Sequence, residues 1–358
     1  MLFPEKVDFK AKHVWLVGAT LLALLLLPAY AWWTAQSYYV TLVSRMMIYG
    51  IAATSLNLLV GYTGLVSLGH ALFLGIGAYA VGITSFHGID NGWLQLLLVV
   101  AGTAVVGALT GLVVLRTQGM AFIMITLAFA QMFFYLGVSL KEYGGDDGMS
   151  LSGRSVLAPF DLESNRQLYY LILALLVATL YLSWRLVHSR FGYVLRGIRS
   201  NERRMKAMGF ATTRYKLAVY VIAGVTTGIA GFLLANLSSY VSPSSSAWTV
   251  SGELVVMVIL GGIGTVFGGA LGALALLLIE ELLSALTEHW MAILGLLIVA
   301  IVLVAKNGIY GSIRTWSIGA RRRAVARAQA QVQGLAQPQP QPQPQIQPQT
   351  LPPAGKTP

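Results

Sequence analysis

Few side chains in this sequence could take part in covalent chemistry, and their spacing argues against it. No two of the five histidines lie three or four residues apart, so their spacing predicts no metal site. Cysteine is absent, which removes thiol nucleophiles and thiolate ligands. The chain has no phosphate-binding sequence of the GxxxxGKS or GxxxxGKT type. The sequence therefore predicts that this chain is not itself an enzyme and binds no cofactor or metal ion.

What remains is a set of polar side chains inside long apolar segments. Polar groups at membrane depth are costly, and they tend to line the path of a substrate. The candidates for such a path are Asn57, Ser67, His70, Thr126, Gln131 and Glu253. For His70 the alternative is a purely structural hydrogen bond between helices. We expect Glu280 and Glu281, near the end of a span, to be solvated.

The composition places these residues in a membrane. Hydrophobic residues make up 56% of the 358 positions and charged residues only 10%, against about 25% charged residues in soluble domains. The net charge of +11 comes mainly from segments that border apolar spans. Contact with membrane lipids explains this charge better than binding to nucleic acid. We predict an all-α, polytopic membrane helix bundle.

The apolar segments predict about ten transmembrane helices, since a span needs roughly 20 predominantly apolar residues. The expected spans are 14–33, 41–61, 66–86, 93–115, 119–138, 168–188, 216–239, 250–269, 270–286 and 289–305. The loop at 189–216 is strongly basic and therefore cytoplasmic, which puts both termini in the cytoplasm. The acidic loop at 139–167 then lies outside, and Arg45 is the one basic residue that fits poorly.

Glycine is concentrated in two intervals, at 61–82 and 261–272. Glycine permits close helix crossing, and it permits a helix to break where other groups satisfy the freed backbone. The glycines expected to act in this way are Gly61, Gly64, Gly69, Gly75, Gly77, Gly261, Gly262 and Gly264. Interrupted segments in both halves of a chain suggest a repeat of two structural halves with a transport site between them, although the two intervals do not align by eye.

The cytoplasmic loop carries local helix signals. Phe191, Leu195 and Ile198 share one face of a short interfacial helix. Asn201 can cap a second short helix that ends at Gly209, with Glu202 at its positive N-terminus. Such a pair can dock into the groove of a partner. The alternative is a solvated basic turn that only fixes the topology.

The remaining segments divide the chain further. We expect residues 1–13 to be a cytoplasmic N-terminus, 14–312 a transmembrane domain, 313–334 a basic cytoplasmic segment and 335–358 a disordered Gln/Pro-rich tail. In the outer loop, Asp146 and Asp147 either dock an external partner or form a solvated turn.

Five motifs in order resemble one family. They are SLNLLVGYTGLVSLGHALFLGIGAYA (55–80), MAFIMITLAFAQMFFYL (120–136), GGDDGMS (144–150), FGYVLRGIRSNERRMKAMGF (191–210) and LGGIGTVFGGALGA (260–273). Together they are similar to the LivM-type permeases of branched-chain amino-acid ABC importers, over about 40–312. The resemblance implies a permease in the bacterial inner membrane.

The resemblance also implies partners. These are a LivH-like second permease, two cytoplasmic ABC ATPase subunits and a periplasmic substrate-binding protein. The loop helix of the family docks on the ATPase, which would give that role to Arg196, Asn201, Glu202, Arg203, Met205, Ala207, Met208 and Gly209. Asp146 and Asp147 would face the binding protein.

Three other functions compete with this interpretation. A urea-type or amide-type ABC permease shares the Gly-rich motif, and GGDDG favours the amino-acid branch. A secondary transporter that works without an ATPase is disfavoured because the spans hold few ionisable residues for a proton relay. An intramembrane enzyme lacks an acid–base pair.

Overall fold

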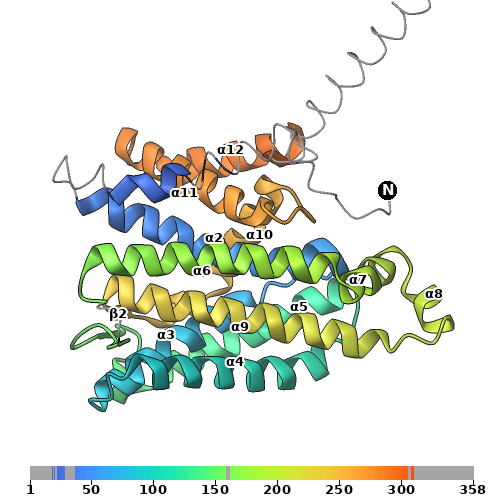
Figure 1. Cartoon of the computed structure of the whole chain (residues 1–358), viewed down its shortest axis with the longest axis horizontal. Helices are drawn as coiled ribbons and strands as arrows, with labels where there is room; N and C mark the ends of the chain where they lie inside the picture. Colours follow the sequence, from blue (N-terminus) through green and yellow to red (C-terminus); the bar gives the residue numbers. More distant parts are fainter. Residues whose placement is uncertain are drawn as a thin grey trace, which may run out of the picture. The chain divides into compact units, whose positions relative to one another are not determined.

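The structure, a computed structural model, describes residues 18, 20, 22–28, 37–158, 162–304 and 308–309. The described chain is almost entirely helical (Figure 1). The long helices are α2 (Ser37–Thr63), α3 (His70–Phe86), α4 (Gly92–Val114), α5 (Met120–Ser139), α6 (Asn165–His188), α9 (Thr212–Ser238), α10 (Trp248–Gly261), α11 (Gly268–Leu286) and α12 (Trp290–Val304). The short elements are η1 (Lys141–Tyr143), β1 (Met149–Ser150), α7 (Arg190–Ser200), α8 (Glu202–Ala207), β2 (Tyr240–Val241) and η2 (Pro243–Ser246).

The helices occupy the segments where the hydropathy predicts spans. Within the described ranges, α2, α4, α5, α6, α9 and α11 are long and apolar enough to cross a membrane, while α3, α10 and part of α12 are shorter apolar helices. A polytopic helix bundle is therefore confirmed, whereas the total of ten spans and the repeat of two halves stay predictions. Most of the predicted span 14–33, together with the segments 1–13, 313–334 and 335–358, lies outside the described residues.

Two predicted spans differ from the helices at one end. The span predicted at 66–86 begins as a helix only at His70, and the span predicted at 250–269 ends at Gly261. Gly262 has φ +117° and ends α10, and Gly64 has φ +77° and ends α2, because these values are incompatible with a right-handed helix. The chain is therefore non-helical at 64–69 and at 262–267. We call these segments the first break and the second break.

The least apolar of the long helices is the most buried, which is the reverse of the pattern in water-soluble proteins. Among the six helices that are long enough to cross a membrane, α2 has the lowest hydropathy, yet 83% of its most apolar window is buried. Its polar residues Ser44, Thr54, Ser55 and Asn57 are all buried. Helices α4 and α5 are more apolar, yet only 33% and 22% of theirs is buried. This is expected when the surroundings are lipid, since apolar side chains gain nothing by turning inward. Helix α2 packs against α6, α9 and α11 at the centre of the bundle (Figure 1).

The two polar loops lie at opposite ends of the helices. Strands β1 and β2 form an antiparallel pair, Met149 with Val241 and Ser150 with Tyr240, at one end of the bundle. Helices α7 and α8 lie at the other end (Figure 1). This arrangement fits the prediction that 139–167 and 189–216 face opposite sides of the membrane.

Candidate functional site

The first break is held by hydroxyl groups. The Thr126 hydroxyl on α5 accepts a hydrogen bond from the Leu68 amide at 3.2 Å. The Ser67 hydroxyl accepts one from the Gly69 amide at 3.2 Å, and Ser251 on α10 accepts one from the Ala71 amide at 2.9 Å. Amides just before a helix and in its first turn have no partner within it, so neighbouring side chains can supply one. The predicted path residues Ser67 and Thr126 are thus buried and bonded to backbone.

Close backbone packing surrounds this break. A methyl group on Gly69 would lie 2.8 Å from the Thr126 carbonyl oxygen. One on Gly75 would overlap Ser246 of η2, and one on Gly77 would overlap the Gly228 carbonyl of α9. The chain between β2 and α10 therefore lies directly against the side of α3. The prediction that these glycines allow close approach agrees with this packing.

The second break is held by one amide group. Asn57 on α2 donates from Nδ2 to the Thr265 carbonyl at 2.5 Å and accepts from the Gly264 amide at 2.9 Å. Gly61, one turn further along α2, is so close that a methyl group there would lie 2.6 Å from the Gly264 nitrogen. Gly264 itself has φ +78°, and Gly261 packs against the Gly268 carbonyl. Asn57 is therefore a bridge between α2 and the second break.

His70 is completely buried at the start of α3. Neither ring nitrogen has a hydrogen-bond partner among the described residues, so the bond between helices that was the alternative does not form here. The ring packs edge-on against Phe73 and Tyr220, with centroids 5.7 and 6.2 Å away. Within the described ranges no three His, Cys, Asp or Glu side chains gather to hold a metal ion.

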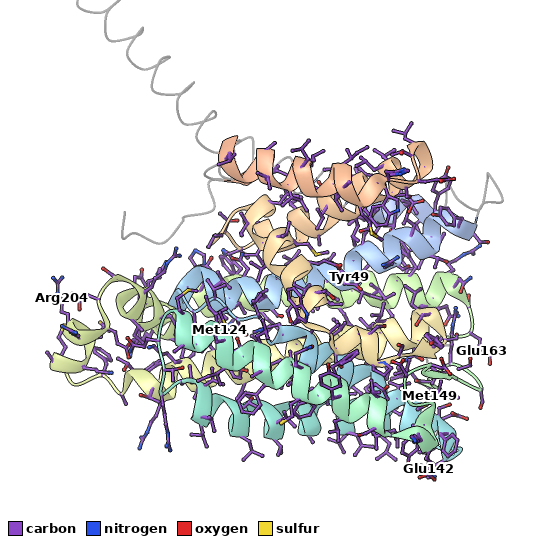
Figure 2. The ribbon with its side chains drawn as sticks, turned by 180° about the vertical axis from the view of Figure 1, so that it is seen from behind. Tyr49, Met124, Glu142, Met149, Glu163 and Arg204 are labelled. Atoms are coloured by element: carbon purple, nitrogen blue, oxygen red, sulfur yellow. The ribbon has the colours of Figure 1, made fainter. Side chains whose placement is uncertain are left out.

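Glu253 lies in a different setting from the buried candidates. It is exposed on α10 and interacts electrostatically with Glu280 of α11 and Arg45 of α2. The Arg45 guanidinium lies over the Tyr49 ring, 5.8 Å from its centroid, and Figure 2 places Tyr49 between α2 and α10. Gln131 is half-buried on α5. The structure thus separates Glu253 from Asn57, Ser67, His70 and Thr126, which are buried.

The helix pair α7–α8 has the caps that the sequence indicates. The Asn201 carboxamide oxygen accepts from the Arg204 amide at 3.0 Å, and Gly209 follows α8 with φ +85°. Met205 packs inward against Val194 and Ile198 of α7. Met208 is 57% exposed, so it is the methionine that α8 presents outward.

Other predicted docking residues also face outward. Arg203 and Ala207 are exposed on α8. Arg196 is half-buried on α7, with its guanidinium 4.6 Å from the centroid of the Tyr193 ring. Exposed basic and apolar groups thus lie together on the helix pair.

Glu202 ties this helix pair to the rest of the bundle. Its carboxylate accepts from Lys216 at 2.5 Å, from Lys206 at 3.1 Å, and from Thr212 and Gln118 at 3.1 Å each. Burial raises the pKa of the Glu202 carboxyl, but the bonds from Lys216 and Lys206 lower it, and the net pKa lies below its ordinary value. The sequence indicated only a favourable charge at a helix N-terminus. It gave no signal for the contacts with Lys216 and Gln118.

The outer acidic turn is built from glycines. Gly144, Gly145 and Gly148 all have positive φ, and Asp146 and Asp147 are exposed between them. The Tyr240 hydroxyl donates to the Asp147 carbonyl, which joins this turn to β2. Both carboxylates therefore face solvent on a fixed turn.

A bundle of apolar helices with buried polar groups at two non-helical segments is the architecture expected of a membrane permease. The sequence comparisons agree with this class. The family model described as "Branched-chain amino acid transport system / permease component" matches residues 38–302, so the chain belongs to that permease family.

Several curated proteins are similar to the chain. LivM, the high-affinity branched-chain amino acid transport system permease protein of Salmonella typhimurium, is 30% identical over 80% of this chain and 73% of its own length. LivM of Escherichia coli is 30% identical over 80% and 74%. LivH, another permease protein of that system in Escherichia coli, is 24% identical over 74% and 91%. No solved structure gives a significant match. The chain is therefore a LivM-type permease and a multi-pass membrane protein.

Proposed function

We propose that this chain is the permease subunit of an ATP-driven importer of branched-chain or related hydrophobic amino acids. The observation that carries the proposal is the match of the permease family over 38–302, which includes the whole α7–α8 pair. A LivH-like permease completes the translocation path, two ABC ATPase subunits bind on the cytoplasmic side, and a periplasmic binding protein delivers the amino acid. The importer lies in the bacterial inner membrane, with both termini of this chain in the cytoplasm.

The helix pair suits an ATPase as its partner. Met208 offers an exposed apolar side chain between basic neighbours, and Asn201 and Gly209 fix both ends of α8. Glu202 holds the pair against α9 and the loop that precedes α5. When the ATPases close, α8 moves with them and displaces the cytoplasmic ends of the broken helices. The cavity then opens alternately to each side.

The translocation path runs along the face that carries Glu253. Glu253 and Arg45 are exposed at membrane depth, where a charge in contact with lipid is expensive. A water-filled path between two permeases removes that cost. It also suits the cargo, because an amino acid carries an ammonium and a carboxylate group that opposite charges attract. The buried residues Asn57, Ser67 and Thr126 support this path by fixing the breaks.

The exposed side of helix α5 is consistent with contact to a second permease. Its large exposed apolar side chains are Met120, Met124, Met132, Tyr135 and Leu136. Met124 lies on the face that Figure 2 presents. An apolar helix with so little burial needs lipid or another protein against it. On the outer side, Asp146 and Asp147 face the binding protein from their fixed turn.

Purification of the tagged full-length chain in mild detergent tests the assembly. We expect a second permease and two ATPase subunits to co-purify, and the reconstituted complex to take up leucine only with ATP and the binding protein. A chain that purifies alone and transports without ATP would be a secondary transporter. Uptake of urea or amides instead of amino acids would place it in the other branch of the family.

A matched pair of substitutions tests the docking face. Met208→Asp puts a charge on the exposed apolar site of α8, and Leu286→Asp does the same at the far end of α11, where Leu286 is 82% exposed. We expect Met208→Asp to release the ATPases while the membrane protein stays folded, and Leu286→Asp to retain them. Deletion of residues 202–208 should abolish uptake although the chain still inserts. Normal ATPase recovery with Met208→Asp would exclude α8 as the docking helix.

A further inference from the structure

Arg199, the residue before the end of α7, reaches into the transmembrane domain although its side chain is largely exposed. Its Nη1 donates a hydrogen bond to the Gly61 carbonyl of α2. In a longer helix this carbonyl would pair with the amide of residue 65, but the turn at Gly64 ends that pattern. The C-terminus of a helix carries partial negative charge, so a guanidinium is well suited to it. A cytoplasmic side chain thus completes the end of the central helix.

The same guanidinium also adjoins both breaks. A methyl group on Gly264, in the second break, would lie 3.2 Å from Arg199 Nη1 and 3.1 Å from the Gly61 oxygen. One on Gly64, at the start of the first break, would lie 3.5 Å from the Arg199 Cγ. Asn57 already bonds the second break to α2 one turn away. Arg199, Gly61, Gly64 and Gly264 therefore form one junction, which we call the arginine junction.

Helix α7 connects this junction rigidly to α8. Met205 of α8 packs against Val194 and Ile198 of α7, and a methyl group on Gly197 would lie 2.6 Å from the Met205 sulfur. Leu195 of α7, one turn before Ile198, is buried in one cluster with side chains of α2 that include Leu58 and Leu59. Helices α7 and α8 therefore move together, and Arg199 is at the place where such a movement meets the breaks.

We propose that Arg199 is a positioning residue that transmits ATPase-driven movement of the α7–α8 pair to both broken segments through the arginine junction. This inference rests on the proposed function, because it needs an ATPase bound to α8. Arg199 touches neither the ATPase face of α8 nor the exposed face with Glu253. We therefore expect Arg199 to affect the amount of amino acid transported per hydrolysed ATP.

Arginine suits this position better than lysine. Its planar group with several donors can hold the Gly61 carbonyl while its remaining N–H groups stay against the Gly264 turn. A lysine keeps the charge and one bond but loses the fixed geometry. Arg199→Lys should therefore be intermediate, whereas Arg199→Gln loses both the charge and most of the reach.

The test measures leucine uptake and ATP hydrolysis together in the reconstituted importer with its binding protein. For Arg199→Gln we expect uptake per ATP to fall by about 5-fold or more, the lower end of coupling factors between sites. Arg190→Gln is the matched control, because Arg190 is an exposed arginine at the other end of the same helix. A merely structural role would reduce uptake and hydrolysis in proportion, by lowering the amount of intact complex. Unchanged uptake per ATP in an intact Arg199→Gln complex would overturn the inference.

A glycine pair provides an independent test. Gly264→Ala and Gly88→Ala place alanine at φ +78° and +71°, but only the Gly264 site has atoms within 4 Å of the new methyl group. We expect Gly264→Ala to lower uptake per ATP and Gly88→Ala to leave it unchanged. In Arg199→Gln/Gly264→Ala the loss should be smaller than the product of the single losses, since both act at one junction. Losses that multiply would mean that the two residues act separately.

The outcomes separate this inference from the proposed function. If no ATPase co-purifies, or if uptake does not need ATP, the proposed function fails. If the complex assembles and hydrolyses ATP normally but Arg199→Gln behaves like Arg190→Gln, only the role of Arg199 fails.

Discussion

At both breaks, side chains bond backbone groups that have no partner within a helix, but the two breaks use different side-chain groups. At the first break, three separate hydroxyls from Ser67, Thr126 and Ser251 each accept one bond from a backbone amide. At the second break, the single carboxamide of Asn57 supplies both a donor and an acceptor. Both arrangements satisfy backbone groups that the ends of helices leave without partners.

The supports behind these groups differ as well. Asn57 belongs to α2, the most buried of the long helices, whereas Thr126 belongs to α5, the least buried. A hydroxyl also rotates freely about its bond to carbon, so it can follow a moving amide, while a carboxamide offers its donor and acceptor in one plane. The second break is therefore fixed to the centre of the bundle. The first break is the one that can adjust as α5 moves.

Among the substitutions that test this difference between the breaks, replacement of Asn57 should lower the stability of the protein most. Asn57→Leu leaves the Gly264 amide without its acceptor, at a cost of about 1–3 kcal/mol. It also removes one of the two hydrogen bonds to the Thr265 carbonyl, which still accepts from the Gly268 amide. We expect a lower unfolding midpoint in detergent and a clear loss of monodisperse protein in size-exclusion chromatography. If Asn57→Leu is no worse than Thr126→Val, the second break is not the more firmly held of the two.

Substitution of glycines should have the next largest effect on the free energy of unfolding. At the second break an alanine should destabilise the protein, whereas at an open helix position it should stabilise it. Gly61→Ala puts a methyl group 2.6 Å from the Gly264 nitrogen, a backbone atom that cannot rotate away. Overpacking of this kind costs about 1–3 kcal/mol. Gly102→Ala on α4 meets only Ile76 at 3.9 Å and should stabilise by about 0.5–1 kcal/mol, because alanine loses less entropy in a helix. Unfolding midpoints that shift in the same direction would contradict the close approach of α2 to the second break.

Thr126 tests whether the first break adjusts. Thr126→Val removes the acceptor of the Leu68 amide, and we expect a loss of about 1 kcal/mol, because nearby groups can move to replace it. Thr126→Ser keeps the hydroxyl and should stay near the wild type. Thr226→Val is the control, since Thr226 is half-buried and its hydroxyl donates to Ile222 of its own helix. A loss as large as that of Asn57→Leu would show that the first break is equally rigid.

The sequence predicts those features whose signals are local. The caps of α8 depend on Asn201 and Gly209, which lie within a few residues of the groups they satisfy, and both agree with the structure. The helix positions follow from hydropathy in the same way. The two breaks are signalled by Gly64 and Gly262, but glycine in an apolar run predicts a helix crossing as readily as a helix end.

The partners of the buried polar residues are not readable in this way. Asn57 bonds a residue 208 positions away, and Thr126 bonds one 58 positions away. Sequence analysis could recognise that polar groups in apolar segments have a purpose, but it could not show which backbone groups Asn57 and Thr126 bond. Their place on a substrate path stays a prediction. Arg45 was noticed only as a poor fit to the charge rule, and Arg199 carried no signal beyond its charge. Their neighbours become visible only in the fold, which brings Arg45 near Glu253 of α10 and Arg199 near Gly264 between α10 and α11.

Acidification should have the smallest effect, and it distinguishes the loop around α8 from both breaks. The pKa of Glu202 lies below its ordinary value of 4.5, so its bonds stabilise the folded loop fully above that value. This stabilisation is lost as the pH falls through the lower folded pKa. Asn57, Thr126, Ser251 and Ser67 do not titrate, so both breaks should hold. Hydrogen exchange, corrected for the intrinsic rate, should therefore increase in 201–209 at low pH but not in 64–69 or 262–267. Glu202→Gln should remove the pH dependence, whereas exchange that rises equally in all three segments would mean that the loop does not open separately from the breaks.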